Sequence, residues 1–539
     1  MDLTRSRTLV VDDHPGMLAS LSRALEACGI RSPHAVRSAR EAVARLRNMR
    51  YDIVLADFDL GLGPDGQQLL EYCRNEHLLA PTAVFVMVTA ERAYDRVMSA
   101  AELAPDDYLV KPFTEETLRL RLVRALERKK KLAEIHELRA SGRHEALLQA
   151  CDRLIGTEPR FAFDLARMKG DALLALARHG EAQAVFEQVL HARAVPWARL
   201  GMARAAAGLC RYGEARSVLT ELLADAPEYL AAYDELSQLH GRCDNEDDAK
   251  AVLQMALEVS PNAVHRHKSI GALALRARDL ETAEAAYSAV VRKSRHGFAP
   301  NPDDHLTLSR IYMDRAKYPQ ALDTLAEAKR TFPGSATVQA SAYAVESLVH
   351  SRAENPRDAR KALDEALAAA NAGGVELARD TALDLARACY LNRREAEGAA
   401  LMRRLVSNNH DDSQLLDQVR RMYRDIDREE QGETLVERCV DDAVRINNEG
   451  VALAKSGDLD GAIELLEEAA GTMPDNAHIV MNAAHALVSH MQMHGLQADK
   501  RERVEAYMRR VHLRHPEHPK YLQVAELYRQ LLQALQAAA

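Results

Sequence analysis

The sequence predicts an α/β domain at the N-terminus, a doubly wound five-stranded parallel sheet, followed by a long all-α superhelix of paired helices. The chain has 539 residues, which exceeds the span of one hydrophobic core. The first part of the chain alternates short apolar runs with helical patterns. Beyond residue 128, small residues recur at a spacing of about 34, which is the period of stacked helix pairs.

Short runs of branched apolar residues predict the strands, because helices cover both faces of a parallel sheet and leave its strands buried. The runs are TLVVD (8–12), DIVLAD (52–57), AVFVMV (83–88) and DYLV (107–110), with a weaker strand near 31–36. Helical patterns separate them at 15–28, 38–48, 66–77, 91–101 and 114–130. This alternation predicts five strand–helix units.

Charged and hydroxylic residues follow the predicted strands at their carboxyl ends. Asp12 and Asp13 end the first strand, Asp57 the third, Thr89 the fourth and Lys111 the fifth. In a doubly wound sheet the ligand site lies at this edge, so we expect the five side chains to converge there. Crowded carboxylates repel one another, and a hard divalent cation with oxygen ligands, Mg²⁺, would relieve that repulsion.

The motifs VVDDHP, IVLADFDL, VMVTA and DDYLVKPF, in this order and spacing, resemble the receiver domain of bacterial two-component response regulators over residues 8–125. The resemblance implies a flavodoxin- or CheY-like fold. It also implies that Asp57 is the phosphoacceptor for a partner's phosphohistidine. Mg²⁺ would be held by Asp12, Asp13, Asp57 and the backbone carbonyl of Asp59.

The same resemblance assigns roles to three further residues. Lys111 would neutralise the transferred phosphoryl group, and Thr89 would hydrogen-bond it. The ring of Tyr108 would act as a switch that moves toward the space that Thr89 vacates. The charge added at Asp57 would thereby change the shape of the receiver surface near Tyr108.

From residue 128 to the end, a small residue, an alanine and often a proline recur at intervals of 12. Examples are Ser237, Ala249 and Pro261, then Ser309, Ala321 and Pro333, then Gly450, Ala462 and Pro474. Trp197-x-x-Leu200-Gly201 and NEGVALAKSGDLDGAIELLEEAAGTMPDN (448–476) resemble the tetratricopeptide repeat (TPR), and the resemblance covers about 130–520. Small residues let paired helices approach closely, and proline ends the second helix.

We therefore expect a receiver domain at 1–127 and a TPR domain at 128–539, with capping helices within 500–535. The repeat pattern weakens between 334 and 445, so a boundary near 300 or 410 is open. The cationic run 128–131 is interpreted as a solvated helix end. His512, His515 and His518 are not interpreted as a metal site, because nearby prolines break the helix that would align them.

Composition narrows the class of protein. The net charge is −9, and the seven cysteines form no C-x-x-C pair. These features argue against a nucleic-acid partner, a zinc knuckle and a disulfide framework. No apolar run approaches the roughly 20 residues that cross a bilayer, so we expect a cytoplasmic protein without a membrane partner.

These patterns predict a phosphorelay response regulator rather than an enzyme, apart from catalysis of its own phosphorylation and dephosphorylation. Its partners would be a sensor histidine kinase or phosphotransfer protein, and a protein or peptide in the TPR groove. Candidate groove residues are His267, Arg310 and Asn447. Two alternatives stay open: a transcriptional regulator that contacts DNA through its helical array, and a phosphate sink or inhibitor that docks a histidine kinase.

Overall fold

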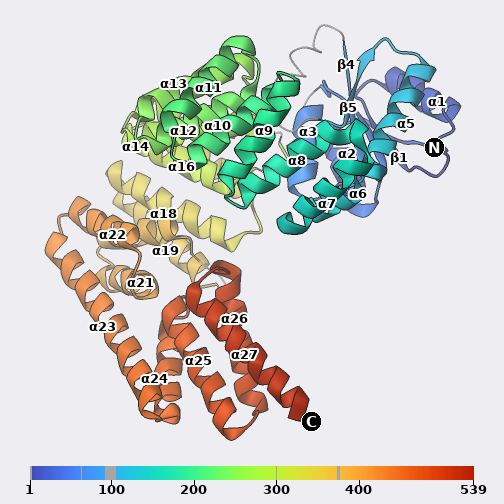
Figure 1. Ribbon diagram of the computed structural model, residues 1–539. Coiled ribbons are helices and arrows are strands. Elements are labelled where there is room, and N and C mark those ends of the chain that lie inside the picture. The colour runs from blue at the N-terminus through green and yellow to red at the C-terminus, as the bar shows by residue number, and fades with distance from the viewer. Residues whose placement is uncertain are drawn as a thin grey trace. The chain divides into compact units, whose positions relative to one another are not determined.

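The computed structural model describes residues 3–61, 63–90, 105–295, 297–298, 300–372 and 377–538. Packing divides the chain into two compact units, Met1–Asp304 and His305–Ala539. The first unit contains the N-terminal α/β domain together with the first helix pairs of the array (Figure 1). The division falls close to residue 300, one of the two positions left open as a boundary.

The N-terminal domain is a five-stranded parallel sheet, as the sequence predicts, and its strand order is β2-β1-β3-β4-β5. Its strands are β1 (Thr8–Val11), β2 (His34–Val36), β3 (Ile53–Asp57), β4 (Val84–Ala90) and β5 (Asp107–Lys111). Its helices are α1 (Pro15–Ala27), α2 (Ala39–Asn48), α3 (Gly66–Asn75) and α5 (Glu115–Lys131). The helix predicted at 91–101 lies outside the described residues.

The alternation of side chains along each strand divides the core into two layers. Leu9 and Val11 pack with Leu69 on the face that α2 and α3 cover. Val10 and Leu55 pack on the opposite face, which α1 and α5 cover. Helices on both faces explain why the strands are continuous apolar runs.

The all-helical array continues from α5. In the first unit it comprises α6 (Ala133–Ala140), α7 (His144–Thr157), the 3₁₀ turn Pro159–Phe161, α8 (Ala162–Ala175), α9 (His179–Ala192), α10 (Pro196–Gly208), α11 (Tyr212–Asp225), α12 (Leu230–Arg242), α13 (Glu246–Val259), α14 (Val264–Arg276) and α15 (Leu280–Ser294). Helix α16 (Pro302–Asp314) begins at the division between the units.

The second unit contains α17 (Tyr318–Thr331), α18 (Ala336–Arg352), α19 (Pro356–Ala370), α20 (Arg379–Leu391), α21 (Glu395–Asn408), α22 (Ser413–Asp425), α23 (Glu429–Ser456), α24 (Leu459–Thr472), α25 (Ala477–His494), α26 (Ala498–Arg514) and α27 (Pro519–Ala538). Helix α23 has 28 residues, and the repeat motif at 448–476 begins within it. Among the described residues, no helix is both long and apolar enough to cross a membrane.

The small residues of the repeat pattern lie where the two helices of a pair touch. The hydroxyl of Ser237 donates to the carbonyl of Ala249 over 3.0 Å, and Ser309 donates to Ala321 over 3.1 Å. In these two pairs the 12-residue spacing therefore marks a close contact between the helices. A second kind of close contact joins α9 and α10, where a Cβ on Gly201 would lie 2.4 Å from the Phe186 ring.

We predict that Gly201→Ala destabilises the first unit. The Phe186 ring is almost fully buried between Gly170 and Gly201, so it has no room to retreat. Such overpacking costs about 1–3 kcal/mol. Calorimetry should therefore show a lower melting temperature for the transition in which the first unit unfolds. Gly213→Ala is the control, because no atom lies within 4 Å of an added Cβ there. Equal melting of the two variants would contradict this account of the helix contact.

A buried histidine beside the junction of α5 and α6, His136, is expected to make the stability of the protein depend on pH. Burial, with the charge of Lys129 as the next contribution, lowers the pKa of His136 from 6.5 to about 4. The folded state therefore keeps His136 neutral, while the unfolded chain takes up a proton below pH 6.5. Stability from the neutral ring is fully present above that pH and is lost as the pH falls toward 4. We expect His136→Gln to make the melting temperature less sensitive to acidification from pH 7 to 5; an unchanged pH dependence would refute this role.

Candidate functional site

Residues at or next to the carboxyl ends of four strands meet at one edge of the sheet. Asp57 ends β3 opposite Val88, and Thr89 follows Val88 in β4. Lys111 ends β5 opposite Ala90. Asp12 directly follows β1, and its amide donates to the carbonyl of Val36 over 3.2 Å. The parallel register therefore aligns residues that are up to 99 positions apart in the chain.

The Lys111 ammonium joins two carboxylates at this edge. Its Nζ lies 2.7 Å from Oδ2 of Asp57 and 3.2 Å from Oδ2 of Asp12. Asp12 is 1% exposed, and its other oxygen accepts the backbone N–H of His14 over 2.9 Å. The expectation that these side chains gather is thus met for Asp12, Asp57 and Lys111.

Burial and charge oppose each other in this cluster. Burial raises the pKa of Asp57, the Lys111 hydrogen bond and charge lower it, and the nearby Asp12 carboxylate raises it further; the net direction is upward. Burial alone would lower the pKa of Lys111, but the hydrogen bond and charge of Asp57, helped by Asp12, outweigh it and raise that pKa. The edge therefore keeps a firmly charged cation among carboxylates that repel one another.

The donor set at this edge suits a hard cation, since carboxylate oxygens are the ligands that Mg²⁺ prefers. The loop after β3 brings Asp13 close as well, because a Cβ on Gly61 would lie 2.7 Å from Oδ2 of Asp13. Within the described part of the chain, however, no three acidic, histidine or cysteine side chains form an assembled metal site. Instead, the Lys111 ammonium bridges Asp12 and Asp57.

The loop between β3 and α3 is fixed against the strand end. The amide of Gly66 donates to the carbonyl of Phe58 over 2.9 Å, and a Cβ at Gly66 would lie 2.2 Å from the carbonyl oxygen of Asp57. Asp65 caps α3 through a capping box with Gln68. The side chain of Asp59 accepts the Gly61 amide over 3.0 Å. Only glycine fits at position 66, so this loop holds Asp57 in place.

Thr89 and Tyr108 are both buried. Thr89 is 1% exposed, and Tyr108 is 6% exposed in the core layer that α2 and α3 cover. The two residues assigned to switching lie on neighbouring strands, two positions apart in register, since Tyr108 pairs with Met87 and Thr89 with Val110.

The phosphoacceptor candidate opens into a cleft of about 620 Å³. Receiver residues on its wall include Asp57, Asp59, Thr89 and Lys111. The remaining wall comes from the helical array, through Asn262, Arg292 and Lys293. This second wall could not be predicted from the sequence, because no local pattern connects Asp57 with residues more than 200 positions away.

The three groove candidates in the array all have internal partners. His267 Nε2 lies 3.0 Å from the carbonyl oxygen of Pro261. Arg310 pairs with Asp384 over 2.6 Å. Asn447 accepts a hydrogen bond from Asn482 over 2.6 Å. These contacts give each residue a structural role within its own unit.

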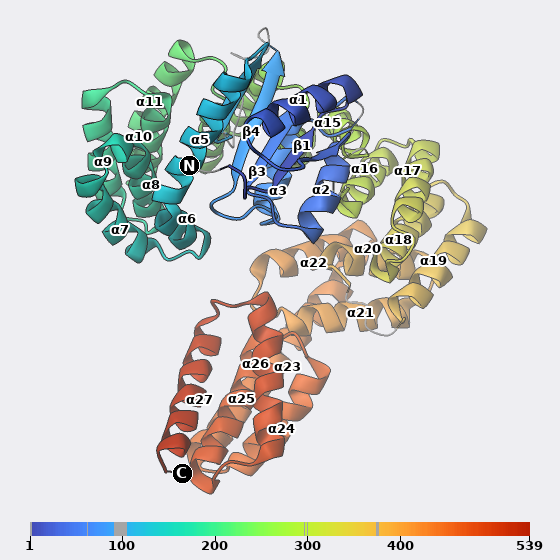
Figure 2. The ribbon, with the colours of Figure 1, turned by 90° about the vertical axis from the view of Figure 1, so that its right-hand side faces the viewer.

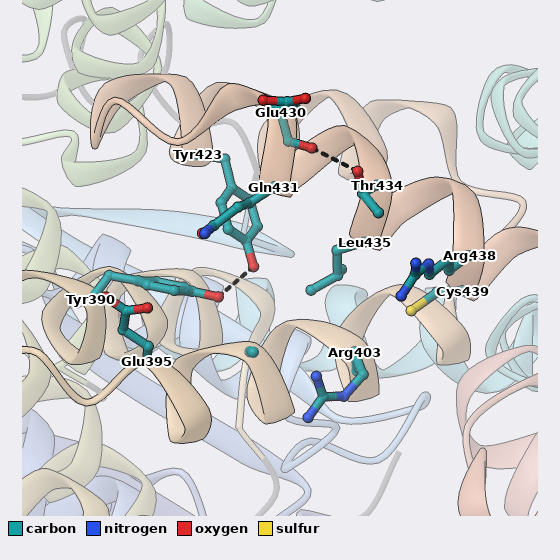
Figure 3. Close-up of a pocket in the computed structure, with 11 residues that line it drawn as sticks. Tyr390, Glu395, Arg403, Tyr423, Glu430, Gln431, Thr434, Leu435, Arg438 and Cys439 are labelled. Atoms are coloured by element: carbon teal, nitrogen blue, oxygen red, sulfur yellow. Dashed lines mark hydrogen bonds between the residues drawn. The ribbon is translucent and has the colours of Figure 1, made fainter.

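A separate cavity of about 530 Å³ lies among α20, α21, α22 and α23. Tyr390 and Tyr423 form one side, with their hydroxyl oxygens 2.7 Å apart, while Arg403 and Arg438 approach from the other side (Figure 3). Neither arginine side chain forms a hydrogen bond or ion pair with any residue that the structure describes.

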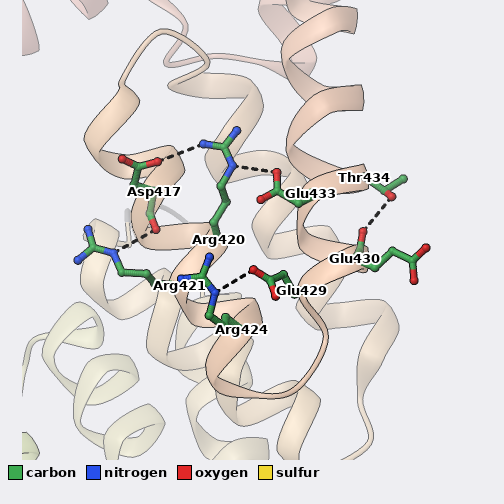
Figure 4. Close-up of polar contacts among 8 residues, drawn as sticks. All are labelled: Asp417, Arg420, Arg421, Arg424, Glu429, Glu430, Glu433 and Thr434. Atoms are coloured by element: carbon green, nitrogen blue, oxygen red, sulfur yellow. Dashed lines mark hydrogen bonds and ion pairs between the residues drawn. The ribbon is translucent and has the colours of Figure 1, made fainter.

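Two arginines of the neighbouring α22 are paired with acidic side chains instead. Arg420 pairs with Glu433 over 3.0 Å, and Arg424 pairs with Glu429 over 2.9 Å (Figure 4). Arg403 and Arg438 thus differ from Arg420 and Arg424 in having no acidic partner among the described residues. Their position was not expected from the repeat pattern.

Two segments of the chain are similar to known protein families. Residues 8–123 match the family model of the response regulator receiver domain, and residues 345–413 match that of the tetratricopeptide repeat. The transcriptional regulatory protein TcrA of Mycobacterium tuberculosis is 37% identical over 123 residues, 23% of this chain and 46% of TcrA. The chemotaxis protein CheY-3 of Vibrio cholerae is 30% identical over 122 residues, 23% of this chain and 92% of CheY-3.

Two solved structures are also similar. A response regulator receiver domain protein from Clostridium thermocellum is 23% identical, with a TM-score of 0.22, over 24% of this chain and 98% of that chain. The C-terminal part of a TPR repeat-containing protein from Cytophaga hutchinsonii is 13% identical, with a TM-score of 0.35, over 47% and 98%.

The fold and its acidic edge define a doubly wound α/β signalling domain joined to a helical repeat array. The chain belongs to the response regulator receiver family through residues 8–123, and it carries tetratricopeptide repeats. It spans about half the length of TcrA.

Proposed function

We propose that this chain acts in a phosphorelay, in which Asp57 accepts a phosphoryl group and the TPR array is the protein-binding output. The observation that carries the proposal is the 2.7 Å contact of Lys111 with Asp57 inside an open cleft. Asp57 supplies a nucleophile, Lys111 supplies a fixed cation, and the cleft would give a partner access to both. Phosphoryl transfer needs little beyond such positioning and charge neutralisation.

In the proposed reaction an oxygen of Asp57 attacks the phosphorus of a partner's phosphohistidine. The new P–O bond forms as the P–N bond breaks. The electron pair of the P–N bond stays on the imidazole nitrogen. The donor would be a sensor histidine kinase or a phosphotransfer protein. Lys111 would neutralise the equatorial oxygens, and Thr89 would donate to one of them.

Mg²⁺ is the proposed cofactor. Asp12, Asp13, Asp57 and the backbone carbonyl of Asp59 would hold it, which requires Lys111 to release Asp12. When bound, the ion would offset the charge of the carboxylates and of the incoming phosphoryl group. No chemistry beyond this self-phosphorylation and dephosphorylation is proposed for the chain.

We predict that Asp57→Asn abolishes Mg²⁺-dependent labelling by acetyl phosphate, measured on a phosphate-affinity gel. The amide cannot form the acyl phosphate. Asp59→Asn is the matched control, since it lies in the same cleft and keeps its backbone carbonyl; its labelling should persist. Continued labelling of Asp57→Asn would remove this residue as the phosphoacceptor.

For the output, the two unpaired arginines beside the tyrosine pair favour an acidic protein segment. Two exposed cations attract carboxylates, while the tyrosine rings are buried and form the wall of the cavity behind them. Each arginine would contribute about 0.2–1 kcal/mol if its pairing stays exposed to solvent.

We expect the double variant Arg403→Glu/Arg438→Glu to lose most of its affinity for a labelled glutamate-rich peptide, measured by fluorescence anisotropy. Arg424→Ala is the control, because that arginine is already paired with Glu429. If both variants bind the peptide as the wild type does, this cavity is not the acidic-segment site.

Two other roles stay distinguishable from this one. TcrA is named a transcriptional regulatory protein, but the match to it spans only 123 residues. A salt-dependent shift of duplex DNA by the full chain would favour a DNA-binding role. Competition with another regulator for a shared kinase, without a TPR ligand, would favour a phosphate sink.

A further inference from the structure

The repeat array places two cations in the same cleft as Asp57. Arg292 and Lys293 lie in the last turn of α15, and Asn262 precedes α14. All three line the cleft opposite the strand edge of the receiver. Figure 2 shows α15 beside the receiver helices within the first unit.

Neither cation is neutralised by a carboxylate that the structure describes. Lys293 donates to the side-chain oxygen of Asn262 over 2.8 Å, and Arg292 makes no side-chain hydrogen bond or ion pair in the described ranges. Burial, together with the charge of Arg292, lowers the pKa of Lys293. Neither side chain is therefore in a direct ion pair within the described ranges, although both share their cleft with the carboxylates of Asp57 and Asp59.

Other cations in the same helix pairs are paired with acids. Lys250 contacts Asp279 over 3.3 Å, and Arg276 contacts Glu246 over 2.7 Å. Cations near a helix C-terminus suit the macrodipole, which explains their presence on α15. It does not explain why this helix end faces the phosphoacceptor candidate.

Contacts independent of these charges hold the end of α15 against the receiver. The rings of Tyr72 and Phe298 stack with centroids 4.5 Å apart, and Phe298 packs on the core layer that α2 and α3 cover. The guanidinium of Arg40 donates to the carbonyl of Gly297 over 3.4 Å. The array wall of the cleft is thus fixed without relying on Arg292 or Lys293.

We propose that Arg292 and Lys293 form an intramolecular binding site for the phosphoryl group on Asp57, so that the array reads phosphorylation directly. The inference rests on the proposed function, because the ligand is the acyl phosphate itself. Phosphorylation replaces a carboxylate of charge −1 with a group that carries up to two negative charges and three acceptor oxygens. These oxygens extend from Asp57 into the cleft that the two cations line.

The new contacts are charge-assisted hydrogen bonds, which are the strong class of such bonds. They would tie the end of α15 to the receiver more tightly in the phosphorylated state. Since α15 packs on α14 through residues such as Ala286 and Ile270, an ordered helix end transmits the change into the repeat stack. The signal then passes within the chain and does not need a second protein to detect the phosphate.

The test uses the full chain with Mg²⁺ and beryllium fluoride, a phosphoryl mimic. Hydrogen exchange is followed in peptides that cover 280–298. In the wild type, adding the mimic should slow exchange there by about tenfold, the effect of one charge-assisted bond on a local opening equilibrium. Arg292→Ala/Lys293→Ala should lose this slowing, whereas the charge-conserving Arg292→Lys/Lys293→Arg should retain most of it.

Arg330→Ala is the matched control, since Arg330 is an exposed arginine in the last turn of α17 and should leave the response intact. Labelling by acetyl phosphate is measured in parallel on every variant. Slowing in Arg292→Ala/Lys293→Ala equal to that of the wild type would overturn the inference. So would a wild type that is labelled at Asp57 but shows no slowing at 280–298. A wild type that is never labelled would instead overturn the proposed function.

Discussion

The contact between the Lys111 ammonium and the carboxylates of Asp57 and Asp12 is the constraint on which the receiver edge depends. Asp12 is almost fully buried, and a buried carboxylate without a counter-charge is costly. The cation must therefore come from the end of β5, and the register of the parallel sheet brings it there. Gly66 completes the arrangement, because any larger residue would push the loop off the carbonyl of Asp57.

Two kinds of contact, apolar and charged, occur where the α/β domain meets the first helices of the array. The apolar stack of Tyr72 on Phe298 fixes one helix end beside the cleft, while charged groups line the cleft itself. Apolar packing is insensitive to phosphorylation, whereas ion pairing changes with each added charge. The first unit therefore combines apolar contacts that would not change on phosphorylation with charged groups that would, as the proposed function requires.

In the array, pairing of charges separates structural from available side chains. Arg310, His267 and Asn447 are engaged internally, as are Arg420 and Arg424. Arg403 and Arg438 are not engaged by the described residues and stand beside two tyrosines. A repeat scaffold leaves such residues on its surface because only the small contact positions are fixed by helix packing.

The sequence by itself determined the receiver sheet, the convergence of Asp12, Asp57 and Lys111, and the helix pairs of the array. These follow from local periodicities: apolar runs specify buried parallel strands, strand ends share one edge, and small residues 12 apart mark helix contacts. Only the tertiary structure decided that Arg292 and Lys293 face Asp57, and that the groove candidates have internal partners. Side chains hundreds of residues apart meet through the summed geometry of many helix packings, and no local pattern in the chain encodes that sum.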